Sequence, residues 1–175
     1  MGNESLFSAP QLKRDPLDRR IPSVYRSHMK VTVRRAEAED AAAIAVCLAA
    51  LGYGTSTMLV AQKLSVLMGS SSDTVLVAED PTTGIVGVVS VHLVPLFHAV
   101  GNLARLTALA VVPGHQRKGT GRALVAAAEA FAWQRDCRRV EITSGDHRED
   151  AHTFYRALGY EMDERRFIKH RSSAL

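Results

Sequence analysis

One short stretch of this chain, from Gln116 to Gly121, constrains the fold more than any other. An apolar run (103–112) precedes it, and an Ala-rich run with helical character (122–135) follows it. A strand, a tight glycine turn and a helix start form a cradle for an anion, because the first amides of a helix have no partner within the helix and its dipole favours negative charge. A glycine at position 119 or 121 lacks a Cβ, so a phosphate can approach the backbone closely. The stretch therefore predicts a ligand with a pyrophosphate group, and three basic residues add positive charge: Arg117, Lys118 and Arg122.

Two other phosphate-binding glycine loops do not fit this stretch. A dinucleotide-binding fingerprint requires G-x-G-x-x-G, but Leu124 stands where the third glycine should be. A P-loop requires G-x-x-x-x-G-K-[ST], and Gly114 and Gly119 have that spacing, but Thr120 stands where the lysine should be. Each interpretation fails at one specific residue.

The pattern that fits is [QR]-x-x-G-x-[GA], with Gln116, Gly119 and Gly121 at its fixed positions. The segment 106–124, LTALAVVPGHQRKGTGRAL, resembles the fourth strand, pyrophosphate loop and third helix of the GCN5-related N-acetyltransferases (GNAT), which hold acetyl-CoA in this way. A second block, 140–145 with 151–160, resembles the fifth strand and fourth helix of the same family. The order and separation of the two blocks agree with the family, so the resemblance rests on more than the six-residue motif.

Hydrophobic periodicity and turn residues predict the order β-α-α-β-β-β-α-β-α-β. The expected strands are 30–35, 74–79, 85–94, 102–112, 139–144 and 160–170, the last a strand or a strand pair; the expected helices are 39–51, 57–68, 122–135 and 149–158. This order is that of an α/β domain with a mixed sheet. With the resemblance, it predicts a single-domain GNAT-like fold: a mixed, mostly antiparallel sheet of six to seven strands, flanked by about four helices.

The first 28 residues differ from the rest of the chain. They contain three prolines and clustered charges with little periodicity, which is typical of a flexible or peripheral extension. We therefore expect an N-terminal extension at 1–28 and an N-acetyltransferase domain at 29–172. Met29 is either the native start or an internal residue, and the sequence leaves that alternative open.

Composition narrows the choice of partners. The 175 residues carry a formal net charge of +4, which suits an anionic co-substrate but does not indicate nucleic acid, and no basic stripe interleaved with aromatics is present. No apolar run approaches the ~20 residues of a membrane span. We expect a cytoplasmic protein that binds neither nucleic acid nor a membrane. The resemblance implies a homodimer.

Neither cysteines nor histidines form a recognisable reactive or metal-binding pattern. Cys47 and Cys137 are interpreted as reduced structural residues. None of the seven histidines makes an H-x-x-x-H pair, and His147 and His152 are five residues apart, which is wrong for one helix face. We therefore expect no metal.

Acetyl transfer to an amine needs a neutral amine, a polarised thioester carbonyl and a stabilised thiolate. The resemblance implies that Tyr155 stabilises the thiolate and that a backbone amide near Leu109 polarises the carbonyl, on a strand that is distorted locally. The position where many relatives carry an acidic base is Ala108 here. Glu141 matches a glutamate that some relatives use as a base. His92, His98 and a water chain ending at Glu79 are fallbacks, since histidine titrates near neutrality.

The resemblance also implies the contacts of acetyl-CoA. The strand would supply Leu109, Ala110 and Val111, and the turn Gln116, Arg117, Lys118, Gly119, Thr120, Gly121 and Arg122. Arg148 stands where many relatives have an asparagine that contacts the pantetheine arm; its role is a CoA phosphate contact or anchoring of the loop. Tyr53, Ser56 and His98 are candidates for acceptor binding.

These observations predict an acetyl-CoA-dependent N-acetyltransferase that acts on a primary amine of a small molecule. We expect direct attack in a ternary complex, because no well-placed nucleophile is visible in the sequence. Two alternatives stay open: a protein N-terminal or lysine acetyltransferase, and a non-catalytic acyl-CoA-binding module, the latter because position 108 carries alanine.

Overall fold

The computed structural model describes residues 31–163 and 167–169. The chain divides into two compact units, residues 1–141 and 142–175. The extension expected at 1–28 and the possible start at Met29 lie outside the described residues.

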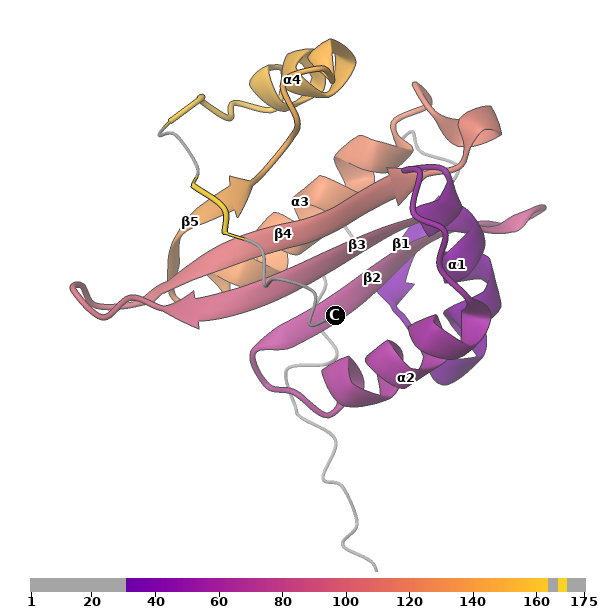
Figure 1. Ribbon diagram of the computed structural model, residues 1–175, viewed down its shortest axis with the longest axis horizontal. Helices are drawn as coiled ribbons and strands as arrows, with labels where there is room; N and C mark the ends of the chain where they lie inside the picture. Colours follow the sequence, from indigo (N-terminus) through magenta and orange to yellow (C-terminus); the bar gives the residue numbers. More distant parts are fainter. Residues whose placement is uncertain (1–30, 164–166, 170–175) are drawn as a thin grey trace, which may run out of the picture. The chain divides into compact units, whose positions relative to one another are not determined.

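The first unit is built on one five-stranded sheet with the strand order β1-β2-β3-β4-β5. Its strands are β1 (Thr32–Arg35), β2 (Asp73–Asp80), β3 (Gly84–Pro95), β4 (Asn102–Val111) and β5 (Cys137–Ile142). The first four strands pair antiparallel with their neighbours. β5 follows β4 after a helical crossover, and Figure 1 shows the two strands pointing the same way. The expected mixed, mostly antiparallel sheet is confirmed.

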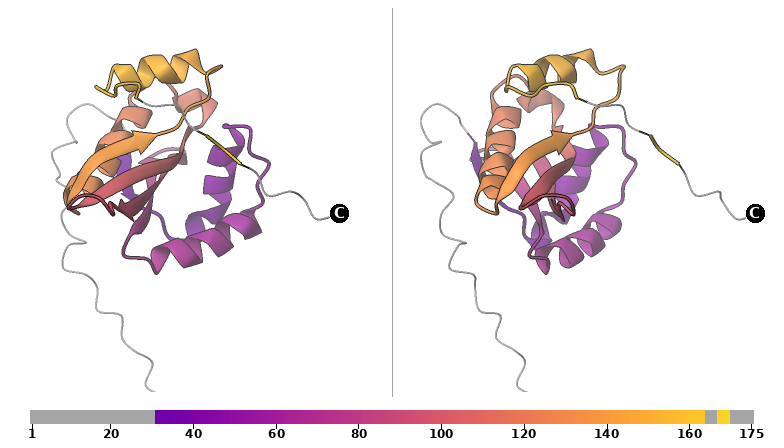
Figure 2. Two further views of the ribbon diagram at one scale, coloured as in Figure 1. Left: turned by 60° about the vertical axis from the view of Figure 1, so that its left-hand side comes forward. Right: turned by 90° about the vertical axis from the view of Figure 1, so that its left-hand side faces the viewer.

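Three helices cover the two faces of this sheet. α1 (Ala41–Ala49) and α2 (Thr57–Met68) lie on one face, and α3 (Thr120–Trp133) lies on the other (Figures 1 and 2). Two short 3-10 helices, η3 (Ala38–Asp40) and η4 (Pro113–His115), precede α1 and α3. The sheet is thus buried on both faces, and β4 runs directly into the turn that begins α3.

The apolar positions predicted from helical periodicity form the core. Ile44 and Cys47 of α1 are buried against Val77, Val88 and Ala110 of the sheet. On the opposite face, α3 buries an apolar stripe that includes Leu124, Val125, Ala128, Phe131 and Ala132. An amphipathic helix on each face is what the alternation of the strands requires.

Two bulges interrupt the strand ladders. The register between β2 and β3 shifts between Ala78 and Glu79, which leaves Val86 of β3 without a direct partner. The register between β3 and β4 shifts between Ser90 and Val91, which leaves Thr107 of β4 as the extra residue. A bulge turns the side chains beyond it to the opposite face of the sheet. The two bulges therefore decide which polar side chains meet in the middle of this sheet.

The second unit contains α4 (Glu149–Arg156). Gly159 follows it with φ +88°, and the amides of Gly159 and Tyr160 donate to the carbonyls of Arg156 and Tyr155 at 3.0 and 3.1 Å. These two bonds make a Schellman motif, in which Gly159 caps the helix.

The strand or strand pair expected at 160–170 is not found. Residues 160–163 and 167–169 belong to no strand, while 164–166 and 170 lie outside the described residues. Met162, Phe167 and Ile168 are exposed. An alternating pattern makes a strand only where one face is buried against a partner, and these side chains bury none. The described sheet accordingly has five strands instead of the expected six to seven.

Within the described ranges, no helix has both the length and the apolar character needed to cross a lipid bilayer.

Candidate functional site

The turn between β4 and α3 has the geometry of an anion cradle. Gly119 adopts φ +88°, a left-handed conformation that glycine enters without strain, and α3 begins at the next residue. The first intrahelical bond runs from the amide of Ala123 to the carbonyl of Gly119 at 3.0 Å. The amides of Thr120, Gly121 and Arg122 therefore precede the first carbonyl of the helix and have no partner within it. Such a helix start fits a phosphate group.

The side chains of the turn complete the cradle. Gln116 donates from Nε2 to the carbonyl of Val111 at 3.0 Å, which ties the turn back to the end of β4. Arg117 holds φ +57°, which is uncommon for a residue with a Cβ. Arg117, Lys118 and Arg122 are exposed, and none has an ion-pair partner among the residues that the structure describes. Three cations without an ion pair to this part of the chain, beside open amides, suit a pyrophosphate.

Close packing behind the turn holds α3 against the sheet. Gly87 of β3 lies under the start of the helix, and a Cβ there would meet the carbonyl oxygen of Ala110 and Cδ1 of Leu124, each at 3.0 Å. Thr120 is 2% exposed and contributes a third neighbour, its Cγ2 at 3.4 Å. The glycine thus brings the first turn of α3 directly onto β3 and β4.

The strand that leads into the cradle is distorted as the family resemblance implied. Thr107 is the extra residue of the bulge in β4, and Leu109 follows two positions later, opposite Val89. Ala110 is buried, while Leu109 and Val111 are half-buried. Their contact with a pantetheine arm stays a prediction.

Glu141, the residue predicted as a base, is already engaged on both carboxylate oxygens. Nη2 of Arg105 donates to Oε2 at 2.5 Å, and Nε of Arg139 donates to Oε1 at 2.6 Å. The carboxylate therefore links β4 to β5 and carries two guanidinium partners. Proton abstraction by Glu141 would compete with both of these bonds.

Glu79, the fallback at the end of a water chain, is also engaged. Nε of Arg34 donates to its Oε2 at 2.8 Å, while Nη1 and Nη2 of the same arginine donate to both oxygens of Asp40. These charge-assisted bonds raise the pKa of Arg34 and tie β1 to β2 and η3. We interpret this cluster as structural, because it holds β1, β2 and η3 together.

A polar network that the sequence did not reveal lies across β2, β3 and β4. Nδ1 of His92 lies 2.6 Å from Oδ1 of Asp73, and its Nε2 lies 2.9 Å from Oγ of Ser90 and 2.8 Å from Oγ1 of Thr107. A hydroxyl of Ser70 hydrogen-bonds Asp73 and is the largest influence that lowers the pKa of this carboxyl. His92 thus bridges an anionic carboxylate and two hydroxyls at the bulge.

In the second unit, Tyr155 is held by aromatic neighbours on α4 and beyond it. Its ring packs edge-on against Phe154 at 5.2 Å and Tyr160 at 5.9 Å between centroids. Burial raises the pKa of the phenol, and the charge of Arg148 opposes that rise without cancelling it. The side chain is therefore neutral at physiological pH and can donate a proton. Arg148 itself is exposed at the N-cap of α4.

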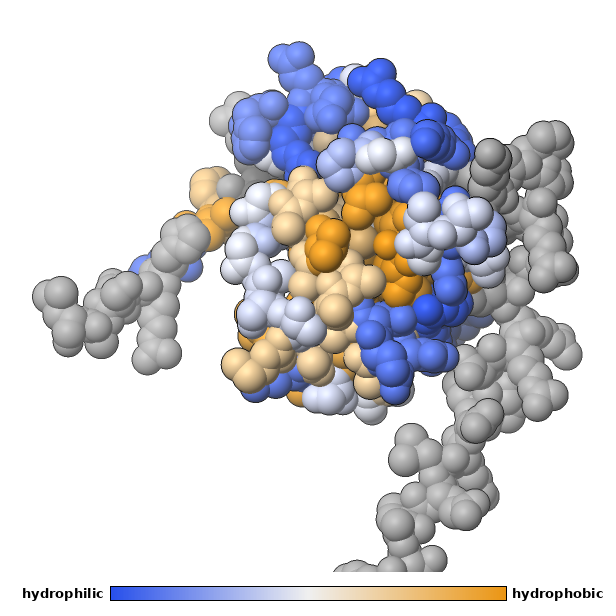
Figure 3. Space-filling view, turned by 90° about the vertical axis from the view of Figure 1, so that its right-hand side faces the viewer, coloured by the Kyte–Doolittle hydropathy of each residue, from blue (hydrophilic) through white to orange (hydrophobic). Residues whose placement is uncertain are grey.

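The three candidates for acceptor binding occupy different places. Tyr53, 60% exposed, and Ser56 lie in the connection between α1 and α2, where the Ser56 hydroxyl caps α2 by accepting from the amide of Leu59 at 3.2 Å. His98 is exposed in the β3–β4 turn, at the end of β4 away from the cradle. Figure 3 looks onto the side where α1 lies and shows apolar residues exposed in its middle.

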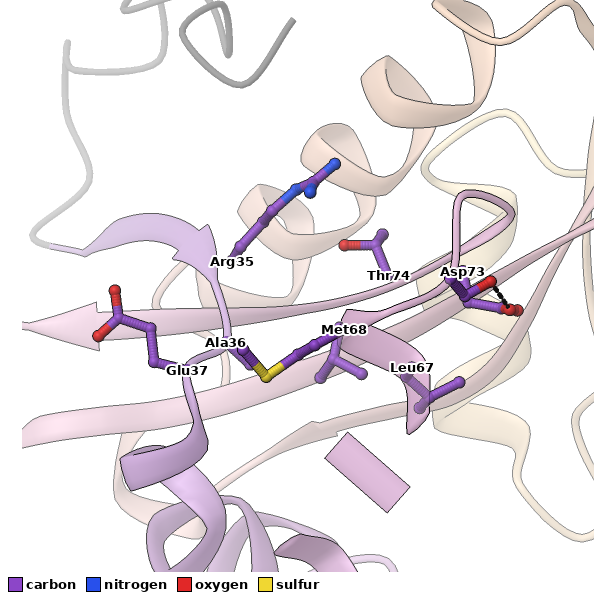
Figure 4. A pocket seen from close by; sticks show the side chains of 9 residues that line it. Arg35, Ala36, Glu37, Leu67, Met68, Asp73 and Thr74 are labelled. Atoms are coloured by element: carbon purple, nitrogen blue, oxygen red, sulfur yellow. Dashed lines mark hydrogen bonds between the residues drawn. The ribbon is translucent and has the colours of Figure 1, made fainter. Parts of the chain in front are cut away.

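A hollow of about 260 Å³ opens beside Asp73 (Figure 4). Its walls come from the end of β1, the end of α2 and the start of β2: Arg35, Ala36, Glu37, Leu67, Met68, Ser70, Asp73, Thr74 and Val75. None of the residues predicted to bind acetyl-CoA lines it. The hollow therefore belongs with the Asp73 network and not with the cradle.

Neither cysteine has the environment of a nucleophile. Cys47 and Cys137 are free and buried, and burial raises the pKa of Cys47 to about 11 and that of Cys137 in the same direction. Thiols that hold their protons at neutral pH are inert. Among the described residues, no group of three or more His, Cys, Asp or Glu side chains could hold a metal ion.

Comparisons with known proteins bear on the whole of this arrangement. The chain matches the model of the acetyltransferase (GNAT) family over residues 38–160. It is 32% identical over 85 residues to the aminoalkylphosphonate N-acetyltransferase of Salmonella typhimurium strain LT2. That match covers 49% of this chain and 55% of the relative, so the chain spans about half of the relative's length.

Two solved structures share the fold. One, described as a transcriptional regulator from Bacillus halodurans C-125, has a TM-score of 0.73 at 21% identity and covers 81% of this chain and 99% of its own. The other, AAC(6')-Iy with the bisubstrate analogue CoA-S-monomethyl-acetylneamine, has a TM-score of 0.71 at 14% identity and covers 81% and 97%. The family model spans most of the chain, including the cradle and α4. The chain therefore belongs to the GNAT family of acetyltransferases.

Proposed function

We propose that this protein is an acetyl-CoA-dependent N-acetyltransferase that acts on the primary amine of a small molecule. The observation that carries the proposal is the cradle at the start of α3. The pyrophosphate of CoA fits a helix start with open amides and the left-handed Gly119. Three cations at this turn have no ion-pair partner among the residues that the structure describes. The family supplies the class of reaction, and the cradle gives this chain the means to hold the donor.

Acetyl-CoA, when bound, supplies an acetyl group activated as a thioester. The amides of Thr120, Gly121 and Arg122 would hold the pyrophosphate, with Arg117 and Lys118 at its flank. Backbone near Leu109, beyond the bulge of β4, would orient the acetyl carbonyl and polarise it. Tyr155, whose raised pKa keeps its phenol protonated, would donate a proton to the departing sulfur.

We propose a small-molecule acceptor because two of the proteins that resemble this chain are named for such chemistry. One is an aminoalkylphosphonate N-acetyltransferase, and the other was solved with a bisubstrate analogue built on an acetylated neamine. We further propose, from the family resemblance, a homodimer in the cytoplasm, and sedimentation of the purified chain measures the first of these.

The test is a thiol-release assay with acetyl-CoA and a panel of small amines, amino acids and short peptides, with CoA binding measured in parallel. The proposal predicts release that depends on an added small amine. Release that depends only on peptides would indicate instead that the acceptor is a protein N-terminus or a lysine. Tight CoA binding without acceptor-dependent release across the panel would favour a non-catalytic acyl-CoA-binding module.

A further inference from the structure

The network of Asp73, His92, Ser90 and Thr107 has the arrangement of an oriented base. All four residues belong to the first unit, and they come from three adjacent strands. Asp73 and His92 are direct partners in the β2–β3 register, Ser90 lies two residues before His92, and Thr107 is the bulge residue of β4. The two bulges bring these side chains together on the face that α1 and α2 only partly cover.

The chemistry of the partners fixes the protons on His92. An ionised carboxylate only accepts hydrogen bonds, and the hydrogen bond from Ser70 holds the pKa of Asp73 below its usual range. Nδ1 of His92, 2.6 Å away, must therefore carry a hydrogen and donate it. In the neutral imidazole, Nε2 then holds the lone pair. That lone pair faces two hydroxyls, which can each donate to it.

Thr107 connects this lone pair to the open side of the strand. Thr107 is exposed, whereas Ser90 is half-buried. Oγ1 of Thr107 lies 2.8 Å from Nε2 of His92. Because Thr107 is the extra residue of the bulge, it has no cross-strand neighbour in β3 to cover it. When the hydroxyl of Thr107 accepts a proton from outside, it can donate its own proton to Nε2 of His92.

We propose that His92 is the general base for the acceptor amine, that Thr107 relays the proton to its Nε2, and that Asp73 is the positioning residue that fixes its tautomer. The inference rests on the proposed function and names the base that the sequence left open. The base that the sequence favoured, Glu141, is instead held by two arginines.

The charges around His92 are compatible with this role. Asp73 faces it from β2, and Arg105 is its register partner on β4. The guanidinium of Arg105 is turned to Glu141, whose carboxylate it shares with Arg139. On the helices of this face, α1 carries no charged residue and α2 carries only Lys63, which is exposed. The carboxylate of Asp73 can thus stabilise an imidazolium as it forms.

The protons balance over one turnover. The acceptor ammonium loses one proton through Thr107 to Nε2 of His92, and the amine forms a C–N bond to the acetyl carbon. The C–S bond breaks, the proposed donor Tyr155 gives its phenolic proton to the sulfur, and the second amine proton restores the phenol. His92 then returns its proton to solvent, so the products are the amide, the free thiol and one released proton.

The experiment compares the pH dependence of kcat/KM for wild type, His92→Gln, Asp73→Asn, Thr107→Val and Thr107→Ser, with CoA affinity and thermal unfolding of each. We expect His92→Gln to lower kcat by about 10²-fold or more and to abolish the acidic limb of the profile, with CoA affinity unchanged. Thr107→Val, at an exposed position that leaves folding intact, lowers kcat, and Thr107→Ser restores it. Asp73→Asn lowers kcat with little effect on KM.

The outcomes separate the two proposals. No amine-dependent release by wild type would overturn the proposed function itself. Release by wild type with an unchanged acidic limb and kcat in His92→Gln would overturn the base assignment alone. If His92→Gln does not fold, Thr107→Val decides: an unaltered kcat and pH profile would overturn the relay and the base together. An acetyl group found by mass spectrometry on Ser90 or Thr107 after incubation without amine would replace the base with a covalent mechanism.

Discussion

Replacing Gly87 by alanine tests how closely the cradle-bearing helix is packed onto the sheet. The new Cβ would lie 3.0 Å from both the carbonyl oxygen of Ala110 and Cδ1 of Leu124, and 3.4 Å from Cγ2 of Thr120. Non-bonded heavy atoms prefer about 3.5–4.0 Å, so two neighbours must each move by about 0.5 Å. The first is backbone, and the second belongs to a side chain that is 0% exposed, so neither has room to move.

The expected loss of stability follows from these contacts. Inserting a methyl group into a filled core costs about 1–3 kcal/mol, and removing the entropy of a strand glycine returns about 0.5–1 kcal/mol. The net loss in the free energy of unfolding is about 1–2 kcal/mol. For a chain of this size, that lowers Tm by about 2–8 °C.

The assay is thermal unfolding of Gly87→Ala beside the matched control Gly114→Ala. A Cβ at Gly114 meets nothing within 4 Å, so the control should unfold with wild type. CoA affinity should also weaken in Gly87→Ala, because α3 must shift away from the sheet together with its first amides. A Gly87→Ala protein as stable as wild type, with unchanged CoA affinity, would refute the packing account.

Three further predictions concern single side chains. Tyr155→Phe should lower kcat while leaving CoA affinity nearly unchanged, and equal turnover measured by thiol release would remove Tyr155 from the mechanism. Glu141→Gln should lower the free energy of unfolding in urea by up to ~1 kcal/mol at low salt, with a smaller loss at high salt, because two half-exposed guanidinium bonds weaken; no loss at either salt would show that the pairs contribute nothing. Hydroxyl and amide donors in the turn after β2 hold the pKa of Asp80 at about 2, below its unfolded value of 3.8. The stability from Asp80 is thus present above about pH 4 and is lost as pH falls toward about 2. When the urea midpoint is plotted against pH, the fall between about pH 4 and about pH 2 should be shallower for Asp80→Asn than for wild type. An unchanged slope in this range would contradict the assignment.

Much of the fold could be predicted because its signals are local. The spacing of apolar residues identified both faces of the core, such as Leu124 on one side and Ile44 on the other. The glycine turn at 119 indicated the start of α3, and Gly159 marks the end of α4. Each of these depends on neighbouring residues in the chain, which the sequence displays directly.

The polar network could not be predicted, because it depends on bulges. The turn between β2 and β3 pairs Asp80 with Gly84. Continued without interruption, that register would put Asp73 opposite Val91 and on the wrong face for His92. The extra residue in β3 moves the partner to His92 and also turns Ile85 toward the cluster formed with α1 and α2. Bulges are set by tertiary packing; Gly87, beside the extra residue Val86, is a local hint of one, but it does not show which side chains the shifted register brings together.

The family resemblance led to the turn at which the structure begins α3 after a left-handed glycine, but it gave less guidance about the base. It pointed to Glu141, whose arginine partners come from two strands and are not visible in the local sequence. It also implied a distorted central strand, and the bulge at Thr107 is that distortion. The site is therefore predictable where it depends on backbone conformation and not where it depends on side chains brought together from distant strands.

The most direct test of the central claim is calorimetric titration of the protein with CoA and with pantetheine, which lacks the phosphates, for wild type and for Gly119→Val. The account predicts that wild type binds CoA far more tightly than pantetheine. It also predicts that this difference disappears in Gly119→Val, because a β-branched residue is strained at φ +88° and deforms the cradle. Equal affinity of wild type for the two ligands, or a folded Gly119→Val that retains the full preference for CoA, would contradict the assignment of the turn.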